Sequence, residues 1–196
     1  MAYKVLNNVS VKDVTSSDLL SLKTDLLVIV INKNTKDKVV NQLAKDVSSH
    51  LKESGSSVLV PNAKSFNAKN VLLVKGFQDS DQIHKLISMY QSIAQKGNQL
   101  KAKDISIMPG TVYPKGKCEM WLIEMVAKTI ESNVYIFSET CNKTAKKPSV
   151  KKLNILVSSL TKSDLIKAKN AAKKGSAIGE GAVSYTHLTL PTTLTV

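Results

Sequence analysis

Leu26–Ile31, with the sequence LLVIVI, is the longest apolar run of this 196-residue chain. It is far shorter than the roughly 20 apolar residues that a membrane-spanning helix needs. Its last part is β-branched, which favours an extended strand, and it contains no polar position. A strand that is apolar at every position is typical of one that is covered on both faces. The run therefore predicts a central strand of an α/β fold.

Further strand-like segments flank this run, and helix-like segments separate them. Strands are expected at Tyr3–Val14 as an edge strand or hairpin, Ser57–Val60 before Pro61, Val71–Val74 before Gly76, Ile105–Met108 and Leu153–Val157. Apolar residues at helical spacing predict helices over Val39–Leu51, Ile83–Ala94, Cys118–Ile130 and from Ser163 or Asp164 to about Gly181. Strands that alternate with helices predict an α/β sandwich, in which helices cover both faces of a mixed sheet.

Several local signals refine these helices. Asp79 or Ser80 can cap the helix that begins near Ile83, and Gly97 is expected to end it. The third helix is apolar nearly all round, so we expect it to be buried, with Trp121 in the core. The last helix is weakly apolar and interrupted by glycine. We expect it to lean on a part of the protein beyond this chain.

The net charge of +13 arises from 28 lysines against 15 acidic residues, and the chain contains no arginine. Arginine is the residue that reads guanine edges and binds phosphate with two parallel hydrogen bonds, whereas lysine acts as a simpler point charge. Specific nucleic-acid binding is therefore disfavoured. The lysine clusters at Lys143–Lys152 and Lys173–Lys174 are expected to be solvated, with attraction of an acidic partner as the alternative.

The residues that could carry chemistry are few and scattered. His50 and His84 have no histidine at metal-ligand spacing and no carboxylate cluster beside them. Cys118 and Cys141 are too few for a disulfide framework and are expected to be reduced thiols, with Cys118 in an apolar helical pattern. The sequence therefore predicts no catalytic residue, no cofactor-binding residue and no metal ligand in this chain.

Glycines do not form a phosphate-binding loop. Gly175, Gly179 and Gly181 follow the spacing G-x-x-x-G-x-G at the end of a predicted helix, which is not specific for phosphate. The chain begins Met1-Ala2-Tyr3-Lys4 without the apolar core of a signal peptide. Since no apolar run is long enough to cross a membrane, we expect no membrane association and a cytoplasmic location.

The last residues, 182–196, read AVSYTHLTLPTTLTV. This stretch resembles a translated transposase adapter of the kind used to prepare DNA for sequencing. Such segments must be kept apart from reasoning about the fold. We expect residues 182–196 to be foreign to the natural protein and to add nothing to the fold, and we expect the natural chain to continue past Gly181.

The order of several segments resembles the N-terminal domain of the cytosol (leucyl) aminopeptidase family. The matching segments are Thr24–Val30, Val71–Phe77, Tyr135–Phe137 with the lysine-rich stretch after it, Asn154–Val157 and Ala171–Gly181. The last of these reads AAKKGSAIGEG, where the family has the pattern A-x-x-x-G-x-A-I-A-E-G. The resemblance covers essentially all of residues 1–181. No single match is highly specific, and it is their order that carries the resemblance.

The resemblance implies a macro-domain-like, three-layer sandwich over residues 1–157. Residues 158–181 would then form a linking helix towards a catalytic domain that this chain lacks. In the family, that domain holds two divalent metals, zinc or manganese, which activate a water molecule against the peptide carbonyl. The metal-binding motifs do not occur in this sequence, so no catalytic or metal residue is carried over. The family is hexameric, and the missing catalytic domain is the expected partner.

Two other functions remain open at this stage. One is a stand-alone macro-like module that binds ADP-ribose or a related nucleotide. Asn32, Asn34 and Asn41 only partly imitate the asparagine-rich element of such modules, and the glycine-rich phosphate loop is missing. The other is a basic domain that binds nucleic acid, for which binding would have to weaken steeply with salt.

Overall fold

The computed structural model describes residues 6–32, 51, 53–77, 83–110, 114, 116–134, 149–158 and 160–188. These residues form a six-stranded sheet with the order β1-β6-β5-β2-β4-β3. The strands are β1 (Asn8–Asp13), β2 (Leu26–Ile31), β3 (Ser57–Pro61), β4 (Asn70–Lys75), β5 (Asp104–Met108) and β6 (Lys152–Val157). All neighbouring strands run parallel except β3, which is antiparallel to β4. The sheet is mixed, as the sequence predicts.

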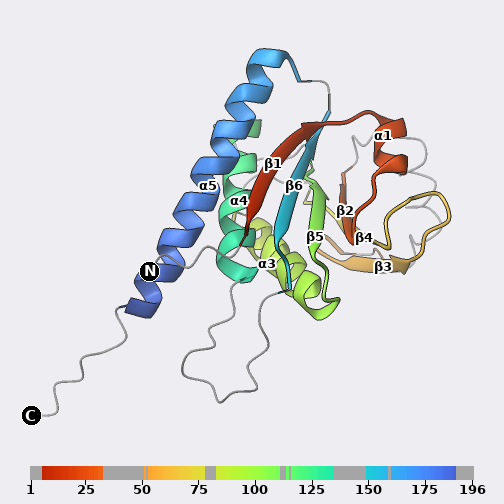
Figure 1. Cartoon of the computed structure of the whole chain (residues 1–196), viewed down its shortest axis with the longest axis horizontal. Helices are drawn as coiled ribbons and strands as arrows, with labels where there is room; N and C mark the ends of the chain where they lie inside the picture. Colours follow the sequence, from red (N-terminus) through yellow and green to blue (C-terminus); the bar gives the residue numbers. More distant parts are fainter. Residues whose placement is uncertain are drawn as a thin grey trace, which may run out of the picture.

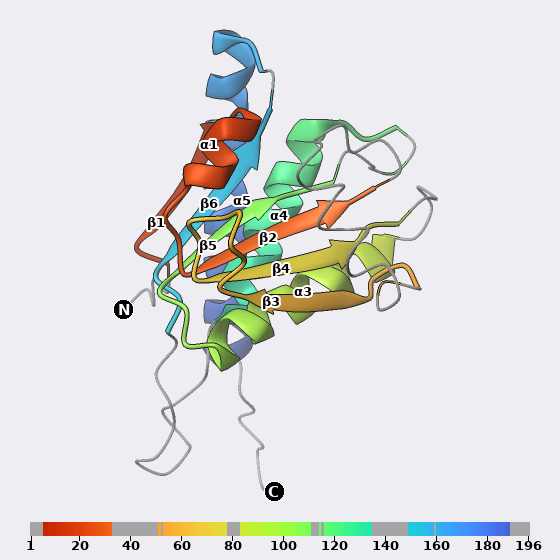
Figure 2. The same ribbon diagram turned by 90° about the vertical axis from the view of Figure 1, so that its right-hand side faces the viewer.

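Helices cover both faces of this sheet (Figures 1 and 2). On one side lie α3 (Ile83–Gln99), α4 (Glu119–Val134) and α5 (Lys162–Leu188), whose apolar residues form one cluster with the sheet. On the other side the short helix α1 (Ser16–Ser21) and the segment 63–68 pack against a second cluster. The predicted arrangement of helices on both faces of a mixed sheet is therefore confirmed.

β2 lies in the middle of the sheet, between β4 and β5. Its side chains alternate between the two faces, as the two-residue period of a strand requires. Leu26, Val28 and Val30 pack towards α3 and α4, whereas Leu27 and Ile29 pack towards α1. Each of these five side chains is buried. The apolar run is unbroken because both faces of β2 are buried.

The helix ends differ from the sequence predictions at several points. Gly97 does not end α3, which continues to Gln99; a Cβ at Gly97 would overlap Ile105, so this glycine permits close packing of the helix on β5. Cys118 is exposed and lies just before α4 rather than within its apolar pattern. Trp121 is half-buried instead of lying in the core. The Lys117 ammonium sits 5.6 Å from the centre of its ring.

Two helix starts depend on capping by a threonine. α1 was not predicted, because six residues are too few for a periodic pattern. Thr15 and Asp18 form a reciprocal capping box at its start, which is a recognisable sequence signal. At the start of α5 the amide of Asp164 donates to the Thr161 hydroxyl, 3.1 Å away, so Thr161 provides the cap. The helix begins at Lys162 rather than at the predicted Ser163 or Asp164. The predicted helix over 39–51 lies outside the described residues, except for residue 51. The predicted caps Asp79 and Ser80 lie in the range 78–82, which is also outside them.

The last helix is held by close backbone contact with α4. A Cβ at Gly175 would overlap the carbonyl oxygen of Glu124, and one at Gly179 would lie 2.7 Å from that of Lys128. The two glycines therefore let the helices approach more closely than any side chain would allow. The helix packs on α4 and β1 within this chain. The expectation that it also leans on a part beyond this chain stays a prediction.

Polar contacts reinforce the contact between α4 and α5. The buried carboxylate of Glu131 accepts from the Ser176 hydroxyl at 2.8 Å and from the Leu6 amide at 3.1 Å. Nearer the start of α4, the Lys174 ammonium lies 3.1 Å from the carboxylate of Glu124. Glu131 therefore joins the segment before β1 to both helices.

α5 also extends further than predicted. It ends at Leu188 rather than near Gly181, and the side chain of Val183 is buried. The first residues of the adapter-like stretch are thus part of the helix, and the expectation that residues 182–196 add nothing to the fold is wrong for residues 182–188. The proposed foreign origin of residues 182–196 stays a prediction.

Membrane insertion finds no support in the helices that the structure describes. None of them combines the length and the apolar character that a transmembrane span requires.

The glycine contacts predict a sharp contrast between two substitutions in the same helix. Gly175→Ala should lower the free energy of unfolding by about 1 to 3 kcal/mol, because its methyl group forces α5 away from α4. Gly181→Ala is the matched control, since nothing lies within 4 Å of a Cβ there. It should be neutral or should stabilise the protein by up to about 1 kcal/mol, the usual gain of alanine over glycine in a helix. Urea unfolding of both variants checks this, and equal effects would contradict the packing role.

Candidate functional site

The carboxyl ends of the five parallel strands meet at one edge of the sheet, and this carboxyl edge is the candidate site. From β2 the chain proceeds to β3 and β4 on one side, whereas β5 is followed by β6 on the other. The chain order therefore reverses between β2 and β5. In open α/β sheets, ligands bind outside the carboxyl ends of strands at such a reversal.

Asn32, the residue directly after β2, occupies the centre of this edge. A Cβ at Gly76, after β4, would overlap the side-chain oxygen of Asn32, and one at Gly110, after β5, would overlap its side-chain nitrogen. The carboxamide therefore lies between two glycines from the two neighbouring strands. Any residue larger than glycine at either position would displace it.

Tyr90 on α3 brings a second polar group to the same region. Its side chain is fully buried, and burial raises the pKa of its hydroxyl well above the usual value, against a smaller opposing effect of the Gly110 backbone. No hydrogen-bond partner is found for the Tyr90 hydroxyl among the described residues. Asn32, Tyr90 and the Gly110 backbone could together recognise a neutral polar group.

Within the described ranges, no three His, Cys, Asp or Glu side chains gather as they would around a metal ion. His84 is exposed on α3, and Cys118 is exposed before α4. His50 and Cys141 lie outside the described residues. The predicted absence of catalytic, cofactor and metal residues stays a prediction.

The lysine clusters are only partly described. Lys173 and Lys174 are exposed on α5, as expected, and Lys174 forms the ion pair with Glu124. Most of the stretch 143–152 lies outside the described residues.

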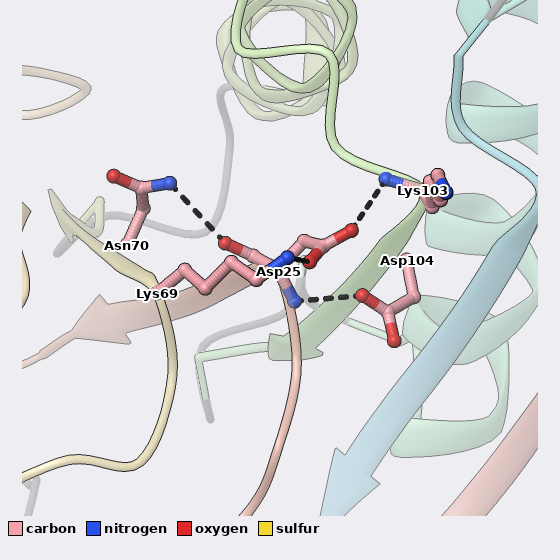
Figure 3. Close-up of polar contacts among 5 residues, drawn as sticks. All are labelled: Asp25, Lys69, Asn70, Lys103 and Asp104. Carbon is pink, nitrogen blue, oxygen red and sulfur yellow. Dashed lines mark hydrogen bonds and ion pairs between the residues drawn. The ribbon is translucent and has the colours of Figure 1, made fainter.

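The opposite, amino-terminal edge of the sheet carries a network of polar contacts centred on Asp25 (Figure 3). The Asp25 carboxylate lies 2.5 Å from the Lys69 ammonium and accepts from the Lys103 amide at 2.9 Å. The Asp25 amide donates to the Asp104 carboxylate at 2.7 Å, and the Asn70 carboxamide donates to the Asp25 carbonyl at 3.4 Å. These contacts join the starts of β2, β4 and β5. We interpret this network as a structural clamp.

The electrostatics of the clamp follow from these contacts. The hydrogen bond from Lys69 has the largest effect and lowers the pKa of Asp25; burial opposes it, and the Lys103 amide lowers the pKa further by a smaller amount. The same hydrogen bond raises the pKa of Lys69. Both groups are therefore charged over a wide range of pH around neutrality.

Sequence reasoning found the carboxyl edge only in part. It used Gly76 as the marker of a strand end, and it noted Asn32 as a weak candidate for nucleotide binding. The available signal was that a glycine follows each of two buried strands and an asparagine follows a third. It did not identify Tyr90, because a tyrosine at helical spacing is indistinguishable from an ordinary core residue.

Comparisons with known proteins bear on the fold. No protein-family model matches the sequence, and no curated protein matches it. Among solved structures, a mutant tomato leucine aminopeptidase is similar, with 19% identity, a TM-score of 0.54, and coverage of 84% of this chain and 35% of that chain. This chain thus spans about a third of the aminopeptidase.

Macrodomains are similar to the same degree. The macro domain of ganglioside induced differentiation associated protein 2 has 16% identity and a TM-score of 0.54, with coverage of 82% of both chains. The Trypanosoma brucei macrodomain in complex with ADP-ribose has 14% identity and a TM-score of 0.53, with coverage of 87% of this chain and 69% of that chain. The chain therefore has a macrodomain-like α/β fold. At these identities the likeness establishes the fold alone.

The Asp25 clamp predicts a pH-dependent contribution to stability. Asp25→Asn keeps an oxygen for the Lys103 amide but removes the charge, and should cost about 0.5 to 1 kcal/mol at neutral pH, as for a partly exposed ion pair. Because the pKa of Asp25 is lowered by folding, the wild-type advantage is present above the ordinary value of 3.8 and is lost as the pH falls below it.

Urea unfolding at neutral and acidic pH measures this effect. Asp13→Asn, at an exposed carboxylate outside the clamp, is the control and should show no comparable gap. A gap for Asp25→Asn that persists unchanged at pH values well below 3.8 would contradict the electrostatic origin.

Proposed function

We propose that this chain is the N-terminal, non-catalytic domain of a metal-dependent aminopeptidase of the leucyl aminopeptidase type. The observation that supports this most directly is the agreement of two independent likenesses. The ordered sequence segments resemble that N-terminal domain, and 84% of this chain is similar in structure to part of a leucine aminopeptidase. The macrodomains share the fold, so the order of the sequence segments favours this proposal.

Under this proposal the chain does not itself cleave peptides. The complete protein would remove N-terminal amino acids from peptides in the cytoplasm, with two zinc or manganese ions in a further domain. It would assemble as a homo-hexamer, largely through that domain. The role of the present domain would be assembly and the control of access to the active sites.

The proposal predicts that the purified 196-residue chain does not hydrolyse leucine p-nitroanilide, with or without added manganese or zinc. No carboxylate cluster that could hold two metals occurs among the described residues. Release of p-nitroaniline, followed by absorbance, measures this directly. Metal-dependent turnover that survives repeated purification would contradict the proposal.

The natural gene provides a separate test. Amplification and sequencing across the codons for Gly175 to Val196 in the source DNA should show a reading frame that continues beyond Gly181. That frame should enter a long domain with lysine, aspartate and glutamate metal-binding motifs. A stop codon directly after Val196 would contradict the aminopeptidase proposal and favour a binding module.

A second candidate function is recognition of ADP-ribose or a related nucleotide at the carboxyl edge. The observation that favours it is the position of Asn32 between Gly76 and Gly110 at the reversal of strand order. A structure of the Trypanosoma brucei macrodomain contains ADP-ribose, and its fold is similar to this one.

Calorimetric titration with ADP-ribose tests this candidate. If the carboxyl edge binds the ligand, Asn32→Ala should weaken binding at least about tenfold, the equivalent of 1.4 kcal/mol. Asn8→Ala, at an exposed asparagine at the start of β1, should leave binding unchanged. The absence of heat with the wild-type chain, or equal losses in both variants, would rule out this site.

A further inference from the structure

The β3 edge of the sheet is an uncharged strand with an exposed leucine. Ser57–Pro61 reads SVLVP and contains no charged residue. In the whole chain, 43 of 196 residues are charged, of which 28 are lysines and 15 are acidic. The Leu59 side chain is 39% exposed, one of three large apolar side chains that are exposed among the described residues. Figure 2 shows β3 as the outermost strand beyond β4. An open, apolar edge strand is a template for pairing with another strand.

The hydrogen-bond pattern shows which backbone groups of β3 face outward. Beyond the two ends of β3, the Asn62 amide donates to the Lys69 carbonyl and the Lys75 amide donates to the Ser56 carbonyl. Hydrogen-bonded and non-hydrogen-bonded pairs alternate along an antiparallel ladder. In this register the backbone groups of Val58 and Val60 therefore form the hydrogen bonds with β4. The backbone groups of Ser57, Leu59 and Pro61 therefore point away from the sheet.

The opposite edge of the sheet is protected. β1 carries Lys12 and Asp13, both exposed, and α5 contacts this strand (Figure 1). Charged side chains and a covering helix are two of the means by which natural proteins prevent edge pairing. At β3 the protection is smaller: Pro61, at the last position, lacks an amide hydrogen, and the Lys96 ammonium of α3 donates to the Ser57 hydroxyl at the first position. The β1 edge is therefore better protected against strand pairing than the β3 edge.

We propose that β3 pairs with β3 of a second copy of this chain, antiparallel and around a two-fold axis at Leu59. The outward-facing residues form a self-complementary set in this register. Leu59 lies opposite the partner's Leu59, and the two can exchange both of their backbone hydrogen bonds. The Ser57 amide can donate to the carbonyl of the partner's Pro61, whereas the Ser57 carbonyl receives no bond there because proline has no amide hydrogen.

The side chains support the same register. Leu59 pairs with Leu72 on β4, which places it on the face of the sheet that α3 covers. Directly opposite residues of antiparallel strands project to the same face. The two exposed leucines would therefore contact one another and remove each other from water. The net charge of +13 opposes association, so the dimer should strengthen as salt screens that charge.

The oligomeric state of the 196-residue chain tests the pairing. Sedimentation or light scattering over a micromolar to near-millimolar series, at moderate salt, should give a mass that approaches twice the 21.3 kDa of one chain. Leu59→Lys should return the mass to that of one chain, because two like charges would lie opposite each other. Leu59→Pro should do the same, since it removes the outward amide and leaves the contacts with β4 intact. Ile166→Lys is the matched control, because it places the same charge at an apolar side chain that is 62% exposed on α5.

Cross-linking provides a second measurement that does not require a stable dimer. In a Cys118→Ser and Cys141→Ser background, Leu59→Cys would place one cysteine on each copy, with their Cα atoms about 5.5 Å apart. This Cα–Cα distance lies within the range for a disulfide. Oxidation of these thiols by diamide should yield a covalent dimer. Ile166→Cys in the same background should yield little. Circular dichroism of each variant establishes that the fold is retained.

Each outcome decides the proposal. A dimer that is lost in both Leu59 variants and kept in the Ile166 variant, together with selective cross-linking at Leu59, supports β3 pairing. A single-chain mass throughout the series without cross-linking overturns it, and so does a dimer that Leu59→Lys leaves intact. These results do not depend on the aminopeptidase proposal, which peptide hydrolysis and gene sequencing test separately.

Discussion

Burial of β2 on both faces is the constraint on which the rest of this structure depends. The strand lies between β4 and β5 and contributes to both apolar clusters. The residues at its two ends belong to different polar arrangements, one at each edge of the sheet. Asp25 at the start joins the beginnings of three strands, whereas Asn32 at the end lies between two glycines. The same strand thus positions a structural clamp and a candidate ligand site at opposite edges.

The outer elements show how the chain controls close approach. Two glycines of α5 bring this helix against the backbone of α4, and Glu131 adds a buried polar contact at that seam. The helix also contacts β1, so one edge of the sheet is shielded. Among the described residues β3 has Pro61 at its end and the Lys96 contact at Ser57, and Leu59 remains exposed between them. This asymmetry is the physical basis for the proposed pairing of two copies.

The same fold occurs in proteins with different functions. Aminopeptidase and macrodomain structures resemble this chain equally well, at identities of 12 to 19%. A sandwich of this kind can serve as a non-catalytic domain or as a nucleotide-binding module, and the fold does not distinguish the two. The distinction depends on particular groups: the carboxamide of Asn32, the hydroxyl of Tyr90, and the residues that follow Gly181 in the natural gene.

The sequence by itself determined where most strands and helices lie and that β2 is buried on both faces, because periodicity and β-branching are local properties. It could not identify the partners of Asp25, since Lys69 and Lys103 are distant along the chain. Nor could it distinguish a glycine that ends a helix from one that permits close packing, as Gly97 and Gly175 show. Only the tertiary structure decided these points, because they depend on which distant backbones meet and how closely.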